Sequence, residues 1–245
     1  MNAGVTSTRT PVLAVSTVIF TLRPDAAGEM RLALPLVRRI RAPHQGKWAL
    51  PGAPLKANED LQASAASSLL STTGLEPRYL EQLYAFGQVD RSPDRVVSIV
   101  YWALIGSDET ASAIESENVQ WFFADEVPEL AFDHNVIIEY ALWRLRSKIE
   151  YSRVALGFLG ETFTLAQLRE VYEVVLGKRL DPGNFRRMVE SASIVEPTGE
   201  YLEGTRHRPP QLYRYNASKD LTDPDPLTLG TTSTRPNARD LGAAS

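Results

Sequence analysis

Two short helices with explicit start and stop signals constrain the fold of residues 151–216 more than any other feature of the chain. Thr164–Gln167 is a Thr-x-x-Gln capping box, which opens a helix with regularly spaced apolar residues that runs to Gly177. Asp181-Pro182 opens a second helix, expected to end near Ser193, because Asp favours the N-cap and Pro the first turn. Two capped helices joined by so short a link predict a helix-turn-helix unit.

The second helix is expected to bury one face and expose the other. Its buried residues are predicted to be Phe185, Met188, Val189 and Ala192. Two strand-like arms follow it, Ile194–Pro197 and Gln211–Tyr215, on either side of the basic loop Gly204–Arg208. Helix, turn, helix and a two-stranded ribbon are the outline of a winged helix-turn-helix domain.

Strand-like runs dominate the chain before Tyr151. They lie at residues 12–22, 31–38, 83–88, 96–104 and 119–123. Helices are expected at 59–73, with an apolar stripe, and from Asp133 to Ile149. The prediction is an α+β protein of two domains, residues 12–150 and 151–216, with a flexible N-terminus at 1–11 and a disordered tail at 217–245.

Composition excludes several kinds of site. The 245 residues include no Cys, which excludes disulfides, thiolate zinc sites and Cys nucleophiles, and the three His lie far apart, which argues against a His-built metal site. The apolar stretch Val12–Leu22 is too short to span a bilayer, for which about 20 apolar residues are needed. Arg23-Pro24-Asp25 follows it in place of a signal-peptide cleavage site. We therefore expect a cytoplasmic protein with no membrane partner.

The net charge of −4 by itself argues against binding of nucleic acid, but the distribution of the charges along the chain does not. Residues 151–215 carry nine Lys and Arg against eight Asp and Glu, and the basic residues gather on the second helix and the ribbon, the elements that meet DNA in this architecture. The predicted DNA-binding residues are Thr164, Lys178, Arg179, Asn184, Arg186, Arg187, Arg206, His207 and Arg208. The alternative is that the domain binds another protein and that its arginines are only solvated.

The segment Trp48–Leu75 resembles the box of the Nudix hydrolases, G-x5-E-x7-R-E-U-x-E-E-x-G-U, where U is aliphatic. The spacing is complete, since the first glycine, the first glutamate, the internal aliphatic residue and the final pair correspond to Ala53, Glu59, Leu69 and Gly74-Leu75. The charged pairs are missing, because Ser67-Ser68 replaces Arg-Glu and Ser71-Thr72 replaces Glu-Glu. The resemblance implies an α/β/α sandwich for the first domain.

The missing carboxylates matter because positions 68, 71 and 72 share one face of a helix. Glutamates there would hold Mg²⁺ against a pyrophosphate, whereas three hydroxyls carry no charge and bind Mg²⁺ poorly. We therefore predict a non-enzyme with no catalytic residue, no metal site and no required cofactor. Two alternatives are a chance match to the box and hydrolysis through relocated acids such as Asp125 or Glu126.

The segment Leu83–Ser98 offers aromatic residues that could stack on a base and two arginines that could pair with phosphates. Together with basic and aromatic residues at 38–48, it would suit a nucleoside diphosphate sugar. The predicted effector-binding residues are Arg38, Lys47, Trp48, Phe86, Asp90, Arg91 and Arg95. The alternative is a solvated hairpin with Tyr84 and Phe86 in the core.

Several segments are similar to the Nudix-related transcriptional regulators, the NrtR family. They are Phe163–Glu173, Asn184–Arg187, Glu196–Gly199, Arg208–Tyr213 and Leu130–His134, besides Leu83–Ser98, and the resemblance covers about residues 12–216. It implies a bacterial repressor of NAD-biosynthesis or salvage genes that binds double-stranded operator DNA as a homodimer. It also implies that ADP-ribose or a related NAD-derived nucleotide releases the DNA by occupying the Nudix-like domain.

A homodimer is also expected on physical grounds, because one small winged helix reads only a few base pairs and two-fold symmetry doubles the contacts. Effector binding would then change the relative placement of the two winged helices by a population shift. Two other classes of function stay open. One is a hydrolase of ADP-ribose or NADH with an accessory helical domain, which the carboxylate count opposes. The other is a nucleotide-dependent protein-interaction module that does not contact DNA.

Overall fold

The computed structural model describes residues 10–107, 109, 114–149, 153–203 and 209–216. The predicted tail at 217–245, nearly all of the N-terminus at 1–11 and the whole ribbon loop Gly204–Arg208 therefore lie outside the described residues. Within the described ranges, the chain has no helix that is both long enough and apolar enough to cross a lipid bilayer.

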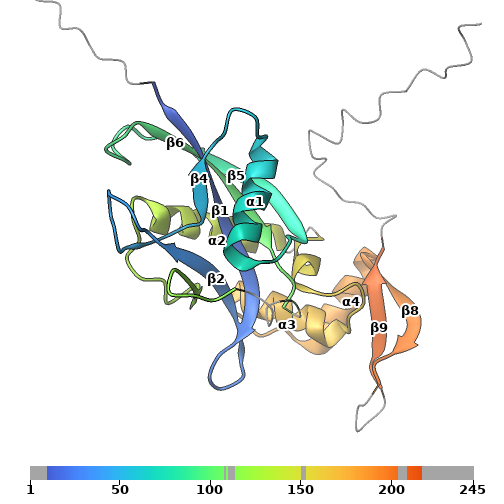
Figure 1. The fold of residues 1–245 in the computed structure, drawn as a ribbon. Helices are drawn as coiled ribbons and strands as arrows, with labels where there is room; N and C mark the ends of the chain where they lie inside the picture. Colours follow the sequence, from blue (N-terminus) through green and yellow to red (C-terminus); the bar gives the residue numbers. More distant parts are fainter. Residues whose placement is uncertain (1–9, 108, 110–113, 150–152, 204–208, 217–245) are drawn as a thin grey trace, which may run out of the picture.

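A mixed sheet forms the centre of the first domain (Figure 1). Its strands are β1 (Val12–Pro24), β2 (Met30–Arg38), β3 (Trp48–Ala49), β4 (Gly52–Pro54), β5 (Tyr79–Phe86), β6 (Val96–Leu104) and β7 (Val119–Phe123). The order is β3-β2-β1-β6-β5, with β4 beside the first half of β1 and β7 beside β2. β1 runs parallel to β6 along its first nine residues, so the long central strand has neighbours on both sides and reads as a continuous apolar run.

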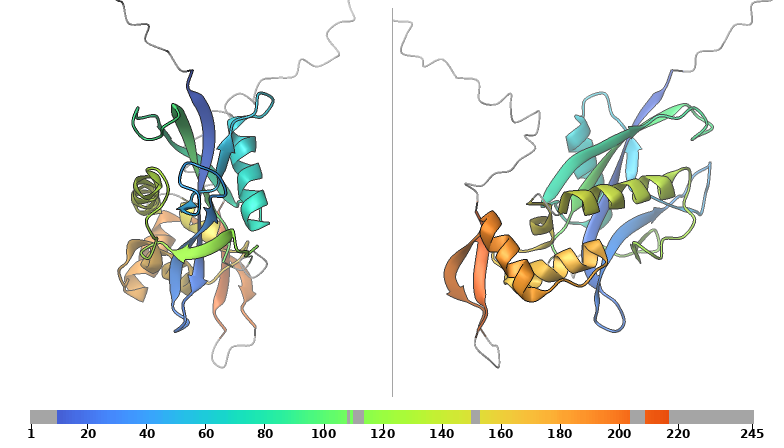
Figure 2. Two further views of the ribbon diagram at one scale, coloured as in Figure 1. Left: turned by 60° about the vertical axis from the view of Figure 1, so that its left-hand side comes forward. Right: turned by 180° about the vertical axis from the view of Figure 1, so that it is seen from behind.

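Two helices cover opposite faces of this sheet, α1 (Leu61–Thr73) and α2 (His134–Ile149), as Figure 2 shows in its left view. Alternate residues of β1 point to alternate faces, because strand side chains have a period of two. Ile19 packs with Leu69 of α1, whereas Phe20 belongs to the core under α2. The predicted α/β/α sandwich is confirmed, and both of its faces are buried.

The second half of the chain is a winged helix-turn-helix, as predicted. It consists of a 3-10 helix η2 (Arg153–Phe158), the helices α3 (Leu165–Leu176) and α4 (Pro182–Ala192), and the antiparallel ribbon β8 (Val195–Tyr201) and β9 (Gln211–Tyr215). Both halves of the predicted capping box are present at Thr164 and Gln167, and Gly177 ends α3 with a φ of 65°. Asp181 caps α4 by accepting from the backbone N–H of Asn184 at 2.8 Å.

Other sequence predictions need correction. β5 begins at Tyr79 rather than Leu83, and the short β3 and β4 were not predicted. β3 and β4 have only two and three residues, which are too few to show the alternation of apolar and polar residues that predicts a strand. They are strands because they pair with β2 and β1. Met188, which we expected to be buried, is 42% exposed, and Ala192 is exposed as well, because the buried stripe of α4 is narrower than predicted and holds only Phe185 and Val189.

The two domains share one buried apolar cluster, which runs from Val18 in β1 through Phe158 in η2 to Tyr213 in β9. Gly157 lies at the junction. A Cβ atom placed on it would lie 2.7 Å from Cδ1 and 2.9 Å from Cβ of Leu104, which is fully buried. The absence of a side chain at Gly157 thus lets η2 lie directly against β6.

We expect Gly157→Ala to lower the free energy of unfolding by about 1–3 kcal/mol, because the added methyl overpacks a junction that cannot expand without moving β6 or η2. Urea unfolding followed by circular dichroism measures this loss. Gly183→Ala in the first turn of α4 is the matched control, since its nearest neighbour there is 3.4 Å away and Ala favours helix. Equal stability of the two variants would contradict the close packing at Gly157.

Candidate functional site

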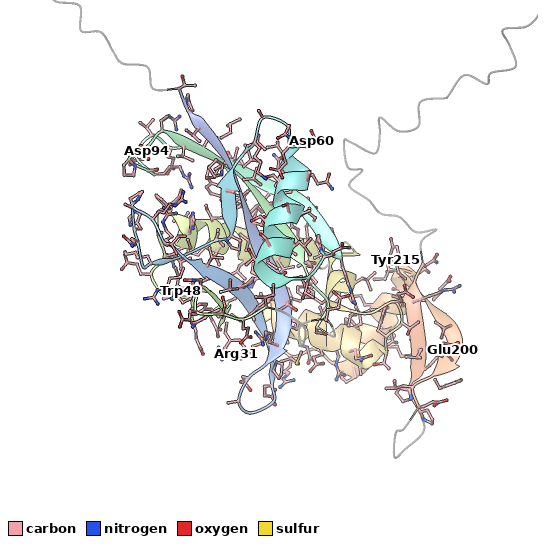
Figure 3. All side chains as sticks on the ribbon, in the orientation of Figure 1. Arg31, Trp48, Asp60, Asp94, Glu200 and Tyr215 are labelled. Carbon is pink, nitrogen blue, oxygen red and sulfur yellow. The ribbon has the colours of Figure 1, made fainter. Side chains whose placement is uncertain are left out.

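Two loops gather at the end of the sandwich that lies away from the winged helix, and they hold most of the predicted effector-binding residues. They are the β2–β3 loop at 39–47 and the β5–β6 loop at 87–95; Trp48 and Asp94, labelled in Figure 3, mark this end. The segment Leu130–His134 joins them, because the backbone N–H of Ala131 donates to the carbonyl of Trp48 at 2.8 Å and Asp133 binds Arg91 of the other loop. Residues far apart in sequence therefore form one candidate site.

Arg91 holds parts of this site together through contacts within the protein. Its Nε and Nη2 donate to the two carboxylate oxygens of Asp133 at 2.8 and 2.6 Å, and Nη1 donates to Oγ of Ser98 at 2.9 Å. The side chain is only 4% exposed. All three nitrogens thus donate within the protein, and the predicted contact of Arg91 with a phosphate stays a prediction.

The other predicted residues of the β5–β6 hairpin lie in different surroundings. Phe86 packs edge-on against Tyr84 and Tyr140, on the side of the sheet that α2 covers. Arg95 donates from Nη1 to the carbonyl of Gly87 at 2.9 Å and closes the hairpin, while Asp90 is exposed at its tip. Of these residues, only Asp90 projects freely towards solvent.

The β2–β3 loop supplies positive charge to the same end of the molecule. Residues 38–47 hold four Lys or Arg residues and His44, with no acid among them. Arg38 is exposed and pairs in register with Trp48, whose ring lies 5.3 Å from that of Phe122. Lys47 binds Glu129 at 2.6 Å. This concentration of cations suits an anionic ligand such as a pyrophosphate.

Sequence reasoning missed a cluster around Phe132. Cζ of Arg39 lies 4.7 Å from the centre of the Phe132 ring, and the centre of the His44 ring lies 4.8 Å from it. His44 and Phe132 both have positive φ, 62° and 56°, a region that costs energy for residues other than Gly and that is frequent at binding sites. No sequence signal marks a non-glycine residue for this conformation.

His134 positions the start of the Nudix-like box. It is buried, and its Nδ1 accepts from the backbone N–H of Leu50 at 2.9 Å. Burial, with smaller contributions from the nearby Arg91 and Arg39, lowers the pKa of His134 to about 4, although Asp133 opposes the shift. The imidazole is therefore neutral at physiological pH, as an acceptor must be.

The box itself is folded as its spacing predicts. Gly52 is tightly enclosed, since a Cβ there would lie 2.6 Å from the carbonyl oxygen of Val15, and Ala53 pairs with Val15 across β4 and β1. On α1, the hydroxyls of Ser71 and Thr72 donate to the carbonyl of Ser68 at 3.0 and 2.7 Å. Their side chains thus bond to their own helix rather than form an oxygen cluster.

No grouping of three or more His, Cys, Asp or Glu side chains that could hold a metal ion occurs within the described part of the chain. The relocated acids that we considered as an alternative, Asp125 and Glu126, both bind Arg31 of β2 at 2.7 Å. They also raise the pKa of the Arg31 guanidinium from its ordinary value.

The second candidate surface is the exposed side of α4. Asn184, Arg186 and Arg187 all lie on it, opposite the buried Phe185. Nε of Arg186 binds Glu190 at 2.7 Å one turn along the helix, and Arg187 donates to Asn184. The three predicted residues therefore form one polar face of the second helix of the helix-turn-helix.

The remaining predicted DNA-binding residues divide into three groups. Thr164 is 4% exposed and its hydroxyl caps α3, so it has a structural role, and its contact with DNA stays a prediction. Lys178 and Arg179 line a groove between α3 and the β1–β2 turn, where Arg179 lies 3.8 Å from Glu29. Arg206, His207 and Arg208 lie outside the described residues.

Comparison with known proteins finds relatives of the winged helix and of most of the chain. The model of the NrtR DNA-binding winged helix domain matches residues 155–215. A relative from Acinetobacter baylyi, named ADPR responsive transcriptional repressor NtrR, is 33% identical over 212 residues, which are 84% of this chain and 82% of that protein. This chain belongs to the NrtR family.

Solved structures agree with the family assignment. NrtR of Shewanella oneidensis, determined in complex with a 27mer DNA, is 34% identical and superposes with a TM-score of 0.72, over 84% of this chain and 94% of its own. A MutT/nudix family protein of Enterococcus faecalis is 25% identical with a TM-score of 0.68, over 87% and 90% of the two chains. The fold is thus a Nudix-like domain joined to the NrtR winged helix.

Proposed function

We propose that this NrtR-family protein is a dimeric, DNA-binding repressor of NAD-biosynthesis or salvage genes. In this proposal residues 12–150 bind ADP-ribose or a related NAD-derived nucleotide without hydrolysing it, and residues 151–216 bind operator DNA. The observation that carries the proposal is the pairing of a basic, exposed α4 in an NrtR winged helix with a Nudix-like box that has lost its carboxylate pairs. The name of the Acinetobacter relative and the DNA complex of the Shewanella relative support it.

Helix α4 has the chemistry for base recognition in a major groove. Arg186 and Arg187 present planar donor pairs suited to guanine, and Asn184 between the helix start and the arginines is suited to adenine. In the free protein, the ion pair with Glu190 would keep the Arg186 side chain extended. DNA would then replace Glu190 as the partner of Arg186. The ribbon would then lie along the phosphate backbone.

The effector would lie at the end of the sandwich described above. Cationic side chains of the β2–β3 loop, with Arg38 and Lys47 among them, would face its phosphates, and Trp48 offers an aromatic ring beside them. Arg91 and Asp133 would hold the two loops and the start of α2 in place rather than touch the nucleotide.

Helix α2 offers a route from the effector end to the DNA-binding end. It begins next to Asp133, and in the right view of Figure 2 it runs along the sheet towards η2 and α3. At its far end, Nε of Arg146 donates to the carbonyl of Val175 in α3 at 3.1 Å. A ligand that favours one position of α2 would therefore also favour one position of the winged helix.

The test is an electrophoretic shift with DNA from upstream of NAD genes, titrated with ADP-ribose. We expect the wild type to bind and ADP-ribose to release it. Replacing Arg186 or Arg187 by Ala should weaken operator binding by about 1–3 kcal/mol each, or roughly 5- to 150-fold. Arg23→Ala, which removes the same charge from the first domain, is the control and should bind as the wild type does.

A second assay addresses hydrolysis directly. Incubation with ADP-ribose and Mg²⁺ or Mn²⁺ should yield no AMP beyond the rate of a protein-free blank, because Ser68, Ser71 and Thr72 stand where the ion's carboxylate ligands would be. Multiple turnovers would refute the non-catalytic part of the proposal. If the wild type bound no upstream DNA, or if the Arg186 and Arg187 variants bound as tightly as the wild type, the repressor part would fail.

A further inference from the structure

Helix α4 exposes a large apolar side chain, that of Met188, on its polar outer side. The side chain is 42% exposed, although burial of a thioether side chain is favourable. Met188 follows Arg187 directly and lies one turn after Asn184, and residues three or four positions apart are neighbours on the surface of a helix. Met188 therefore borders residues that are predicted to contact DNA.

The two flanks of the outer side of α4 differ in charge. With about 3.6 residues per turn, Asn184 and Met188 fall on one flank, whereas Arg186 and Glu190 fall on the other. The hydrogen bond to Glu190, with a smaller contribution from Tyr213 of the ribbon, raises the pKa of the Arg186 guanidinium. The charged flank therefore lies towards β9, which stands beside α4 in Figure 1, and Met188 belongs to the uncharged flank.

The chemistry of Met188 suits one particular group in the major groove of DNA. Thymine carries a 5-methyl group there, beside the hydrogen-bond donors and acceptors that the four bases present. A thioether side chain is flexible and polarisable, so it packs against apolar groups of varied shape, and its sulfur is only a weak hydrogen-bond acceptor. Contact between Met188 and a thymine methyl would remove two exposed apolar groups from water, which favours binding.

Asn184 brings this apolar side chain close to an A·T pair. An asparagine side chain is suited to adenine, and the base opposite adenine is thymine, whose methyl group lies in the same groove. The amide oxygen of Asn184 accepts from Arg187, so these two polar side chains are held together beside Met188 in the free protein. An apolar side chain next to an asparagine that reads adenine is therefore positioned for thymine.

We propose that Met188 recognises the 5-methyl group of a thymine in the operator, in or next to the base pair that Asn184 contacts. The inference rests on the proposed function, to which it adds a preference for one base. Arginines also bind phosphates, which are the same in every sequence, so much of their contribution is affinity for any DNA. The thioether of Met188 has no charge, and its contribution is to the choice of sequence.

The test compares the same DNA with and without thymine methyl groups. The region upstream of NAD genes is amplified once with dTTP and once with dUTP, so that the second fragment carries uracil, which lacks only the methyl group, at the amplified thymine positions. Electrophoretic shifts give the affinity for each fragment. We expect the wild type to bind the uracil fragment at least about fourfold more weakly, since one buried methyl group contributes roughly that factor.

Variants separate the Met188 contact from the effect of uracil on the shape of the DNA. Met188→Ala should lose most of the preference for thymine, because a change in DNA shape affects both proteins alike, whereas a lost contact is shared between the two changes. Met188→Leu keeps an apolar side chain and should keep the preference. Both residues favour helix, so circular dichroism should show that the fold of these variants is unchanged.

A matched control weakens DNA binding without touching the methyl contact. Arg187→Ala, on the same helix, should bind both fragments more weakly but keep the wild-type ratio between them. Leu70→Ala removes an exposed apolar side chain from α1 in the first domain and should bind both fragments as the wild type does.

The inference and the proposed function fail in different ways. Equal binding of the two fragments by the wild type, or an unchanged ratio in Met188→Ala, would overturn the role of Met188 and leave operator binding intact. Met188 would then be an exposed side chain without a partner on the DNA. A wild type that binds neither fragment would refute the repressor function and, with it, any contact between Met188 and an operator.

Discussion

Replacing Asp133 by Ala should lower the free energy of unfolding by about 3–5 kcal/mol, since it leaves a buried charge without its partner. Arg91 is 4% exposed and gives two of its three hydrogen bonds to the Asp133 carboxylate, so the variant would keep the guanidinium in the interior with Ser98 alone. If the β5–β6 loop instead rearranged to expose Arg91, the loop would lose its packing against the rest of the domain, which would also lower the free energy of unfolding. Either outcome also disconnects the two loops of the candidate effector site.

Urea unfolding followed by tryptophan fluorescence and circular dichroism measures this effect. Asp90→Ala is the matched control, because it removes an exposed carboxylate from the same region and should change stability by no more than about 0.5 kcal/mol. Combining Asp133→Ala with Arg91→Met should recover part of the loss, since no buried charge is then left unpaired. If Asp133→Ala and Asp90→Ala were equally stable, the Arg91–Asp133 pair would not be the anchor that we describe.

Acid should destabilise the protein through His134. Its pKa is about 4 in the folded protein, against an ordinary value of 6.5, so below 6.5 the unfolded chain binds a proton that the folded protein does not. The contribution of this group is fully present above pH 6.5 and is lost as the pH falls towards about 4. With about 1.4 kcal/mol for each pKa unit, the loss approaches about 3 kcal/mol.

The measurement is the free energy of unfolding at a series of pH values between about 7 and about 4, for the wild type and for His134→Gln. A glutamine carbonyl can accept from Leu50 but does not titrate in this range, so the variant should be less sensitive to acid over the same interval. The difference between the two curves isolates His134 from the carboxylates. If the free energy of unfolding fell equally with pH in the two proteins, His134 would have the same pKa in the folded and unfolded states, contrary to this prediction.

Local signals were sufficient to predict the winged helix. The capping box at Thr164, the glycine stop at Gly177 and the Asp-Pro start at Asp181 all appear in the structure where the sequence places them. Each depends on contacts between residues fewer than five positions apart, which any chain with these residues can make. The same holds for the spacing of the Nudix-like box, where α1 ends at Gly74.

The surroundings of individual side chains were harder to predict, because they depend on residues that lie far away in sequence. The sequence does not show that Arg91 pairs with Asp133, 42 positions away, and its predicted contact with a phosphate stays a prediction. Thr164 was predicted to touch DNA and is buried as a cap, and Met188 was predicted to be buried and is exposed. The basic ribbon residues Arg206 to Arg208 stay predictions.

Periodicity, capping and composition are properties of neighbouring residues. They were therefore enough to predict where the two helices of the winged helix begin and end, that the chain has two parts, and that the box lacks its carboxylate pairs. The folded structure was needed to show that the Arg91–Asp133 pair joins two loops, that His134 stays neutral next to the box, and that Trp143 and Tyr84 share one exposed face. These features arise from distances between residues that lie far apart in sequence. Burial and electrostatic interactions depend on those distances, which no pattern among neighbouring residues predicts.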